Sequence, residues 1–337
     1  MRSDSNTTPV SGPGFLVISP SLDCNNACIF CYDNYRVKGS RPAASAQEIA
    51  ADAARMAARM GVGAVAVSGG EPLLYAELEQ LTRLLKAAGL FVCVMTNGRL
   101  LARAQRLERL LEAGVDHFHI PLHSDDQAAH DAVTGVAGSF AQTVAGLANV
   151  AEVRARRPLG LTVVHVMHRR NYRRLPELVD FVAGFAPDHA LLSHCIVEVQ
   201  SPREHLALLA RFEDIAPFVA QAHRVGQARG LPVYVENVPP CMMRGREAIC
   251  VDFHKFNRLA VGGFKAAGER GEGGFEPFEQ SIKSGQRTHA DQCRRCAIQD
   301  FCGGFYRSYI EAMGQPDLEP YSVQELRSRQ AAARQTS

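Results

Sequence analysis

The chain has 337 residues, of which 46% are hydrophobic and 21% charged, a balance typical of folded globular proteins rather than disordered ones. Its net charge of +2 excludes the overall positive field of an obligate nucleic-acid binder, so a nucleic-acid partner is not expected. No apolar run approaches the roughly 18 residues of a membrane helix, and no signal peptide opens the chain. We therefore expect a cytoplasmic protein without a membrane partner, whose 10 cysteines serve ligation or redox chemistry.

From residue 15 to about residue 200, short runs rich in Val and Ile alternate with segments of helical periodicity. Six strands are predicted: Phe15 to Ser19, Ala64 to Ser68, Phe91 to Thr96, His117 to Leu122, Leu161 to Met167 and Ala190 to Val197. Capping boxes at Ser45 and Glu48 and at Ser139 and Gln142 predict two helix starts, the first helix covering Ala46 to Met60. Gly61, Gly89 and Gly114 are predicted to end three helices.

These alternating units predict an α/β fold, a partial (β/α)6 barrel with its chemistry at the carboxyl ends of the parallel strands. A helix of about residues 203–230 follows, and Pro232, Pro239 and Pro240 then mark a break. We expect a polar tail over residues 1–14, the barrel with its following helix over 15–235, a small cysteine-rich auxiliary domain over 236–314 and a polar tail over 315–337. The small domain lacks a large apolar core and is expected to require a metal.

Three cysteines follow the first predicted strand at the spacing C-x3-C-x2-C: Cys24, Cys28 and Cys31. Three thiolates on one tight loop can hold three corners of a [4Fe-4S] cluster and leave the fourth iron open to bind a substrate. A structural zinc site needs a fourth ligand, which is not near in sequence, although a histidine from elsewhere could supply it.

The region of about residues 15–200 resembles the radical S-adenosylmethionine (radical SAM) superfamily. The resemblance lies in the three cysteines with Phe30 at the aromatic position, in Gly69-Gly70-Glu71-Pro72 after the second strand and in Thr96-Asn97-Gly98 after the third. It implies that Cys24, Cys28 and Cys31 hold the cluster and that the open iron chelates S-adenosylmethionine. It also implies that one electron, from a flavodoxin- or ferredoxin-type donor, releases a 5′-deoxyadenosyl radical that takes a hydrogen atom from the substrate.

Further residues are expected at the cofactor. Gly69 and Gly70 allow close backbone approach, and the loop carbonyls with Glu71 could accept hydrogen bonds from the methionyl ammonium group. Phe30, Pro72 and Asn97 belong to the same motifs. The resemblance suggests that His123 and Ser124 lie near the ribose or carboxylate and that the backbone of residues 196–198 reaches the adenine. The alternative is that His123 and Ser124 are ordinary hydrogen-bonded loop residues.

A second cysteine group comprises Cys241, Cys250, Cys293, Cys296 and Cys302. Over about residues 236–310 it resembles the SPASM and twitch extensions of radical SAM enzymes, which hold auxiliary iron-sulfur clusters. Tyr306 stands where a full SPASM pattern has its next cysteine, so we expect one auxiliary [4Fe-4S] cluster on Cys241, Cys250, Cys293 and Cys296. Cys302 is then an exchangeable ligand, a buried thiol or a hydrogen-atom donor, and zinc is the alternative metal.

The sequence therefore predicts a radical SAM oxidoreductase or maturase that oxidises, cross-links or epimerises a peptide or other natural product. Two alternatives are a dehydrogenase or epimerase of an aminocyclitol or sugar and, more distantly, a non-catalytic iron-sulfur or zinc protein. Because only about fourteen residues precede the first strand, a separate protein is expected to recognise any leader peptide. The basic stretch of residues 168–174, with Arg169 and Arg170, is either a solvated helix start or a site for an acidic substrate group. Cys93 and Cys195 are predicted to be core thiols.

Overall fold

The computed structural model describes residues 15–31, 44–197, 201–252, 262–263, 276–277, 286–300 and 302–326. Seven parallel strands form one curled sheet in the order β7-β6-β5-β4-β3-β2-β1. Their bounds are β1 Phe15–Ile18, β2 Ala64–Val67, β3 Phe91–Met95, β4 His117–Pro121, β5 Gly160–Met167, β6 His189–His194 and β7 Val233–Glu236. Two short strands, β8 Gly262–Gly263 and β9 Glu276–Pro277, extend the sheet beyond β1. The predicted tail of residues 1–14 and residues 327–337 of the C-terminal tail lie outside the described residues.

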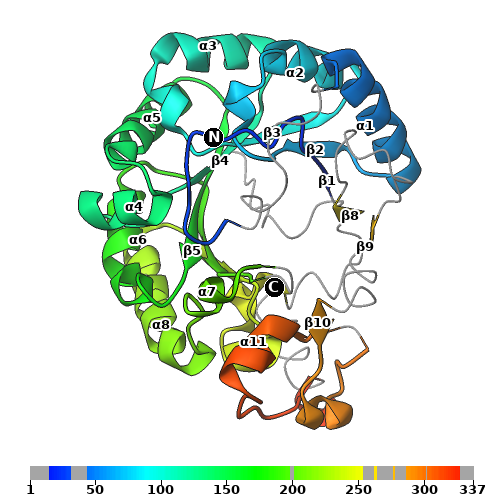
Figure 1. Cartoon of the computed structure of the whole chain (residues 1–337), viewed down its shortest axis with the longest axis vertical. Helices are drawn as coiled ribbons and strands as arrows, with labels where there is room; N and C mark the ends of the chain where they lie inside the picture. The colour runs from blue at the N-terminus through cyan, green and yellow to red at the C-terminus, as the bar shows by residue number, and fades with distance from the viewer. Residues whose placement is uncertain are drawn as a thin grey trace.

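Helices cover the outer side of the curled sheet, from α1 at one end of the arc to α8 at the other (Figure 1). They are α1 Ala46–Met60, α2 Leu78–Ala87, α3 Ala104–Ala113, α4 Gln127–Thr134, α5 Ser139–Arg154, α6 Leu175–Ala183 and α8 Phe212–Arg229, whereas the short α7 Arg203–Leu206 lies inside the arc. Apolar side chains such as Leu16, Val92 and Phe118 point from the strands into this layer and are fully buried. The main core therefore lies between sheet and helices, which leaves the strand ends to carry polar loops.

The prediction of six strands is wrong by one, because β7 joins the sheet next to β6. The prolines around residues 232–240 looked like a break, but Pro232 stands just before the strand, where a missing N–H is tolerated. Its carbonyl oxygen accepts a hydrogen bond of 2.9 Å from the Ala190 N–H of β6. The single helix predicted over about 203–230 is in fact α7 and α8, separated by residues 207–211. The fold is thus a seven-stranded half-barrel rather than a six-unit one.

The helix caps agree with the sequence in part. Ser45 and Glu48 form the capping box of α1, and Gly61 and Gly114 cap their helices in the left-handed conformation, so these predictions are confirmed. The predicted box at Ser139 is wrong, because Ser139 is the first residue of α5 and its hydroxyl donates to Asp131 Oδ1 at 2.8 Å. Asp131 also accepts hydrogen bonds from the backbone of residues 138 and 140, so a carboxylate from α4 caps α5 instead.

The C-terminal elements lie beside α7 and α8 at the far end of the arc from α1 (Figure 1). They comprise the strand pair β10 Arg287–Thr288 and β11 Phe305–Tyr306 and helix α11 Arg307–Met313. Tyr309 of α11 stacks on Phe212 at a centroid distance of 4.2 Å, and the Ser308 hydroxyl donates to the Val197 carbonyl oxygen. The cysteine-rich part is therefore packed directly onto the half-barrel. Within the described part of the chain, no helix is both long and apolar enough to span a bilayer.

Candidate active site

The first three cysteines lie on a loop that follows β1; we refer to residues 24–31 as the cysteine loop. All three thiols are half-buried. Burial raises the pKa of Cys28 to about 12, and the nearby Cys31 and Cys24 add to this effect. Ionising the three thiols together is therefore unfavourable unless a cation compensates, as the irons of a cluster do. The donor set fits a [4Fe-4S] cluster that has three protein ligands and one open iron.

The far side of the cysteine loop rests on the carboxyl end of helix α4. The Ala27 N–H donates to the Thr134 carbonyl oxygen at 2.8 Å, and the Ile29 N–H donates to that of Val133 at 3.0 Å. The last carbonyls of a helix have no partner within the helix, so the loop satisfies them. Gly135 ends α4 with φ +69°, and a Cβ there would come within 2.7 Å of the Ala27 carbonyl oxygen. Glycine is needed here both for the left-handed turn and for the close approach.

The near side of the loop lies against Gly69 and Gly70, which follow β2. An added Cβ at Gly70 would stand 2.3 Å from the Asp23 carbonyl oxygen, and one at Gly69 would stand 2.4 Å from that of Ser21. The Gly70 N–H donates to the Ser21 carbonyl oxygen at 3.0 Å. We expected these glycines to allow the backbone to approach a cofactor. In the structure, they allow residues 21–23, which lead into the cysteine loop, to pass close to residues 69 and 70. Pro72 is buried and begins the 3-10 turn η2 Pro72–Leu74.

The carboxylate of Glu71 is buried and bound within the protein. Its Oε1 accepts from the Thr96 hydroxyl at 2.6 Å and the Leu73 N–H at 2.9 Å, and its Oε2 accepts from the Asn97 N–H at 2.7 Å. Burial raises the pKa of Glu71 against the effect of these donors. The side chain ties the loops after β2 and β3 together, and its contact with a methionyl ammonium group stays a prediction.

The turn after β3 holds the cysteine loop through polar side chains. Asn97 Nδ2 donates to Asn25 Oδ1 at 2.6 Å. Arg99 Nη1 donates to the Asn25 carbonyl oxygen and, at 2.8 Å, to Asn26 Oδ1. The sequence motif pointed to Asn97, whereas Arg99 was not predicted. Its position two residues after Asn97, in the same turn, was the signal available in the sequence.

Phe30 packs against two buried histidines, His123 and His168, and the His123 ring in turn contacts those of His130 and His165. The Phe30 ring lies 5.0 Å from that of His123 and 6.1 Å from that of His168. In each histidine, one ring nitrogen is buried without a hydrogen-bond partner among the described residues. Burial lowers the pKa of His130 and His165 to about 4 and that of His168 to about 3, so these imidazoles are neutral near pH 7. They provide a polar but uncharged wall behind the loop.

The remaining predicted contacts at the strand ends have mixed outcomes. Ser124 is buried, and its Oγ accepts from the Asp126 N–H at 3.1 Å, an ordinary loop hydrogen bond. The assignment of His123 and Ser124 to the ribose or carboxylate stays a prediction. Of residues 196–198, expected near the adenine, Glu198 lies outside the described residues. Val197 is buried in an apolar cluster that contacts Phe30.

The basic stretch after β5 divides into paired and exposed guanidinium groups. Arg174 binds Asp125 through two contacts, one of them 3.0 Å from Nε to Oδ1. Arg169 and Arg170 are exposed at the same end of the sheet. Arg174 is thus exposed but already paired with Asp125, whereas no ion pair between described residues includes Arg169 or Arg170.

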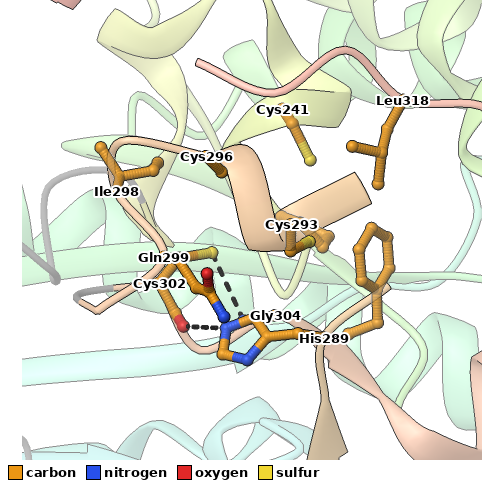
Figure 2. A pocket seen from close by; sticks show the side chains of 11 residues that line it. Cys241, His289, Cys293, Cys296, Ile298, Gln299, Cys302, Gly304 and Leu318 are labelled. Carbon is orange, nitrogen blue, oxygen red and sulfur yellow. Dashed lines mark hydrogen bonds between the residues drawn. The ribbon is translucent and has the colours of Figure 1, made fainter. Parts of the chain in front are cut away.

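Four of the five C-terminal cysteines line one pocket, which we refer to as the cysteine pocket. Cys241 lies in the 3-10 turn η5 Pro240–Met243, Cys293 in the turn η7 Asp291–Arg295, and Cys296 and Cys302 follow η7. Figure 2 shows these segments around a common space, with His289 beside Cys302. Burial raises the pKa of Cys241, and the nearby Cys302, Cys293 and Cys296 reinforce the effect. Four thiols so arranged suit a closed [4Fe-4S] cluster.

The structure brings together three of the four predicted ligands, and Cys302 lines the pocket with them whereas Cys250 does not. The physical reason is the additional strand. Residue 250 follows the turn η6 Glu247–Ile249 and forms a parallel bridge with Val235 of β7, which fixes it at the sheet edge. There it is fully buried, and its thiol donates to the Val238 carbonyl oxygen at 3.6 Å. Of the two predicted core thiols, Cys195 is buried and Cys93 is half-buried.

Within the described ranges, no group of three or more His, Cys, Asp or Glu side chains could hold a metal ion. A cluster poses a different requirement, because each of its thiolates binds its own iron and the donors surround a cube rather than one point. The choice between an auxiliary cluster and zinc stays a prediction.

Comparison with known proteins relates the half-barrel to one superfamily. The model of the radical SAM superfamily matches residues 18–182. A PqqA peptide cyclase of Rhodopseudomonas palustris is 32% identical over 168 residues, which cover 49% of this chain and 43% of that protein. A probable GTP 3',8-cyclase of Methanocella arvoryzae is 33% identical over 173 residues, which cover 50% of this chain and 53% of that protein. The chain thus spans about half the length of the curated relatives it matches.

Solved structures match over more of the chain. SuiB of Streptococcus suis, bound to the precursor peptide SuiA, has a TM-score of 0.67 at 18% identity and covers 93% of this chain and 76% of its own. Native anSMEcpe with bound AdoMet and the Cp18Cys peptide has a TM-score of 0.63 at 16% identity and covers 96% of this chain and 97% of its own. At these identities the similarity concerns the fold.

Proposed function

Because this chain belongs to the radical SAM superfamily, we propose that its cysteine loop binds a [4Fe-4S] cluster at which S-adenosylmethionine is cleaved, and that the enzyme modifies a peptide. The observation that carries the proposal is the loop itself. Cys24, Cys28 and Cys31 are brought together by backbone contacts with the glycines after β2 and with the end of α4. Three thiols on a loop so constrained can ligate three irons of a cluster and leave one for a cofactor.

When bound, the cluster and S-adenosylmethionine supply a 5′-deoxyadenosyl radical that removes a hydrogen atom from the substrate, after one electron has come from an external flavodoxin- or ferredoxin-type donor. The protein's own residues hold the loop and keep water away. Ile29 and Phe30 pack against an apolar cluster that contains Cys195, Val197 and Leu208. Such a wall excludes water from one side of a reactive site.

The peptide assignment is supported by the similarity to a PqqA peptide cyclase and by the shared fold with SuiB, which was solved with its precursor peptide. The exposed Arg169 and Arg170 at the carboxyl end of β5 provide guanidinium groups for acidic side chains of a peptide. We include in the proposal a separate protein that recognises a leader peptide. Oxidation, cross-linking and epimerisation of the peptide are the reactions to be distinguished.

For the cysteine pocket we propose one auxiliary [4Fe-4S] cluster on Cys241, Cys293, Cys296 and Cys302. This revised set is supported by the shared lining of the pocket and by the effect of the three other thiols, which raise the pKa of Cys241. A cluster there would link the turns η5 and η7, in addition to the apolar contacts of Phe305 and Tyr309 with the main core. It could also take an electron from a substrate radical, which would make the overall reaction an oxidation.

The test of the primary activity is anaerobic reconstitution with iron and sulfide, followed by dithionite and S-adenosylmethionine. We expect 5′-deoxyadenosine from the wild-type protein and none from Cys28→Ala. Cys93→Ala is the matched control, because Cys93 lies in β3 outside both cysteine groups and its loss should leave the product intact. Absence of 5′-deoxyadenosine from a cluster-loaded wild-type protein would contradict the proposal.

The substrate class requires a second measurement. Peptides encoded beside the gene, synthesised with deuterium at their carbon positions, are incubated with the reconstituted enzyme, and GTP is tested in parallel because of the GTP cyclase relative. Deuterium in 5′-deoxyadenosine from a peptide, with a matching mass change in that peptide, supports peptide modification. Turnover of GTP alone would replace the peptide assignment with a nucleotide one.

A further inference from the structure

We infer that Arg99 is a positioning residue for the cluster, whose guanidinium fixes the two-asparagine part of the cysteine loop and places a permanent positive charge beside the bound metal. This inference rests on the proposed binding of a cluster by Cys24, Cys28 and Cys31. It assigns a role to a side chain that lies outside the cysteine, glycine and TNG motifs.

The guanidinium of Arg99 donates hydrogen bonds only to neutral oxygen atoms in the contacts described here. Its Nη1 donates to the Asn25 carbonyl oxygen and to Asn26 Oδ1 at 2.8 Å, and its Nε donates to Gln142 Oε1 on α5 at 2.7 Å. Of the ion pairs between described residues, none includes Arg99. Burial raises the pKa of the Glu71 carboxylate, and the Arg99 charge acts to lower it without a direct ion pair. The same charge can act on an anionic group at the cysteine loop.

The turn that carries Arg99 is fixed on two sides. Gly98 adopts φ +77°, and a Cβ there would meet Ile120 Cγ2 at 2.7 Å. A Cβ on Gly146 of α5 would stand 2.2 Å from the Gly98 carbonyl oxygen, so helix and turn touch through backbone. The Asn97 carbonyl oxygen accepts from the Thr143 hydroxyl at 3.0 Å. Because the backbone of this turn is fixed by packing, the Arg99 side chain can hold a loop that has no regular secondary structure.

Arg99 acts on the sulfur ligands through the asparagines. The Asn26 N–H lies 3.4 Å from Cys24 Sγ and donates to it, and the side chain of the same asparagine accepts from Arg99. Hydrogen bonds to cluster sulfurs and net charge both set the potential of an iron-sulfur cluster. Because reduction adds negative charge, losing a nearby cation and loosening an N–H···S bond both disfavour the reduced form.

The test uses the full chain, reconstituted anaerobically, as wild type, Arg99→Gln, Arg99→Lys and the control Arg103→Gln. Arg103 lies four residues further along, is exposed, and is the N-cap of α3 without a side-chain cap hydrogen bond. At a solution potential that half-reduces the wild-type cluster, we expect Arg99→Gln to lower the ratio of reduced to oxidised cluster about tenfold, the size of effect that one partly screened charge produces. Electron paramagnetic resonance measures that ratio and the spectral change caused by S-adenosylmethionine.

Arg99→Lys separates geometry from charge, because lysine keeps the charge but its single nitrogen cannot replace both Nη1 at the asparagines and Nε at Gln142. We expect a ratio near that of wild type and an altered spectral response to S-adenosylmethionine. Wild-type ratio and response in both Arg99 variants would overturn the inference. If Arg99→Gln fails to take up iron, Arg99→Lys decides alone, since a wild-type response from it would refute the positioning role.

Failure of the proposed function gives a different result from failure of this inference. If wild-type protein holds no cluster or makes no 5′-deoxyadenosine, the proposed function is wrong. If the wild type does both and the Arg99 variants match it, only the role of Arg99 is wrong.

Discussion

Replacing Cys302 and Cys250 separately by alanine distinguishes the two candidate ligand sets of the auxiliary cluster. The structure places Cys302 in the cysteine pocket and Cys250 at the β7 edge. Two [4Fe-4S] clusters correspond to about 8 irons per chain. With three thiolates left in the pocket, Cys302→Ala is expected to lose most of the auxiliary cluster and to retain about 4 irons, whereas Cys250→Ala should stay near 8.

The Cys250 variant should instead reveal itself as a packing defect. Its side chain is fully buried among apolar residues, so removing the sulfur leaves a small cavity and costs about 1 to 2 kcal/mol of unfolding free energy. The thiol also donates a weak hydrogen bond of 3.6 Å to the Val238 carbonyl oxygen, which adds little. A lowered urea midpoint with unchanged iron is thus the expected signature.

The assay counts iron and acid-labile sulfide in anaerobically reconstituted protein and records the visible absorption of the clusters. Cys93→Ala serves as a control for handling losses, because that thiol lies in neither group. Equal iron loss from Cys250→Ala and Cys302→Ala would refute the reasoning, as would full iron in Cys302→Ala. The first result would mean that metal binding moves Cys250 from the sheet edge into the pocket.

Three further predictions follow from the half-barrel. Glu71→Gln places an amide N–H against the Asn97 N–H, so we expect the unfolding free energy to fall by about 1.5 to 3 kcal/mol. Urea titration measures this loss. An unchanged urea midpoint would show that the buried carboxylate does not stabilise the fold. Gly70→Ala puts a Cβ 2.3 Å from the Asp23 carbonyl oxygen, so the formation of 5′-deoxyadenosine should fall strongly. The control Gly63→Ala, where a Cβ has open space, should stay active. Equal activities of the two variants would contradict the close-approach argument. Burial holds the pKa of His130 and His165 at about 4, below the ordinary value of 6.5, so the unfolded chain binds more protons between these values. Their contribution to stability is therefore complete above about pH 6.5 and is lost as the pH falls to about 4, by at most about 3 kcal/mol for each. Urea unfolding at several pH values measures this, and His165→Leu should flatten the dependence; a flat wild-type profile would refute it.

Much of the barrel could be predicted because its elements follow local rules. The Val-rich runs and the cap of α1 by Ser45 and Glu48 are short-range signals, and the structure reproduces them. Strand β7 escaped prediction because it has only four residues, Val233–Glu236, and because the prolines on either side of it indicated a break. Its place in the sheet depends on pairing with β6, which is a tertiary property.

The site shows the same division between local and distant information. The spacing of Cys24, Cys28 and Cys31 identifies a ligand loop without any knowledge of its surroundings. In contrast, the choice between Cys250 and Cys302 depends on where β7 ends, and the inward orientation of Glu71 depends on donors from the loop after β3. A motif states which residues are available, whereas packing decides which of them remain accessible to a cofactor.

The cysteine loop has no regular hydrogen-bonding pattern of its own, so its shape is imposed from outside. The glycines after β2 contact its entry, the Asn97–Arg99 turn holds its middle, and the end of α4 holds its exit. Each contact uses backbone groups or buried polar atoms, which lose more free energy when displaced than exposed groups do. Cluster geometry should therefore depend on residues that bind neither metal nor cofactor, and variants at these three supports should change the cluster's spectrum before they change its iron content.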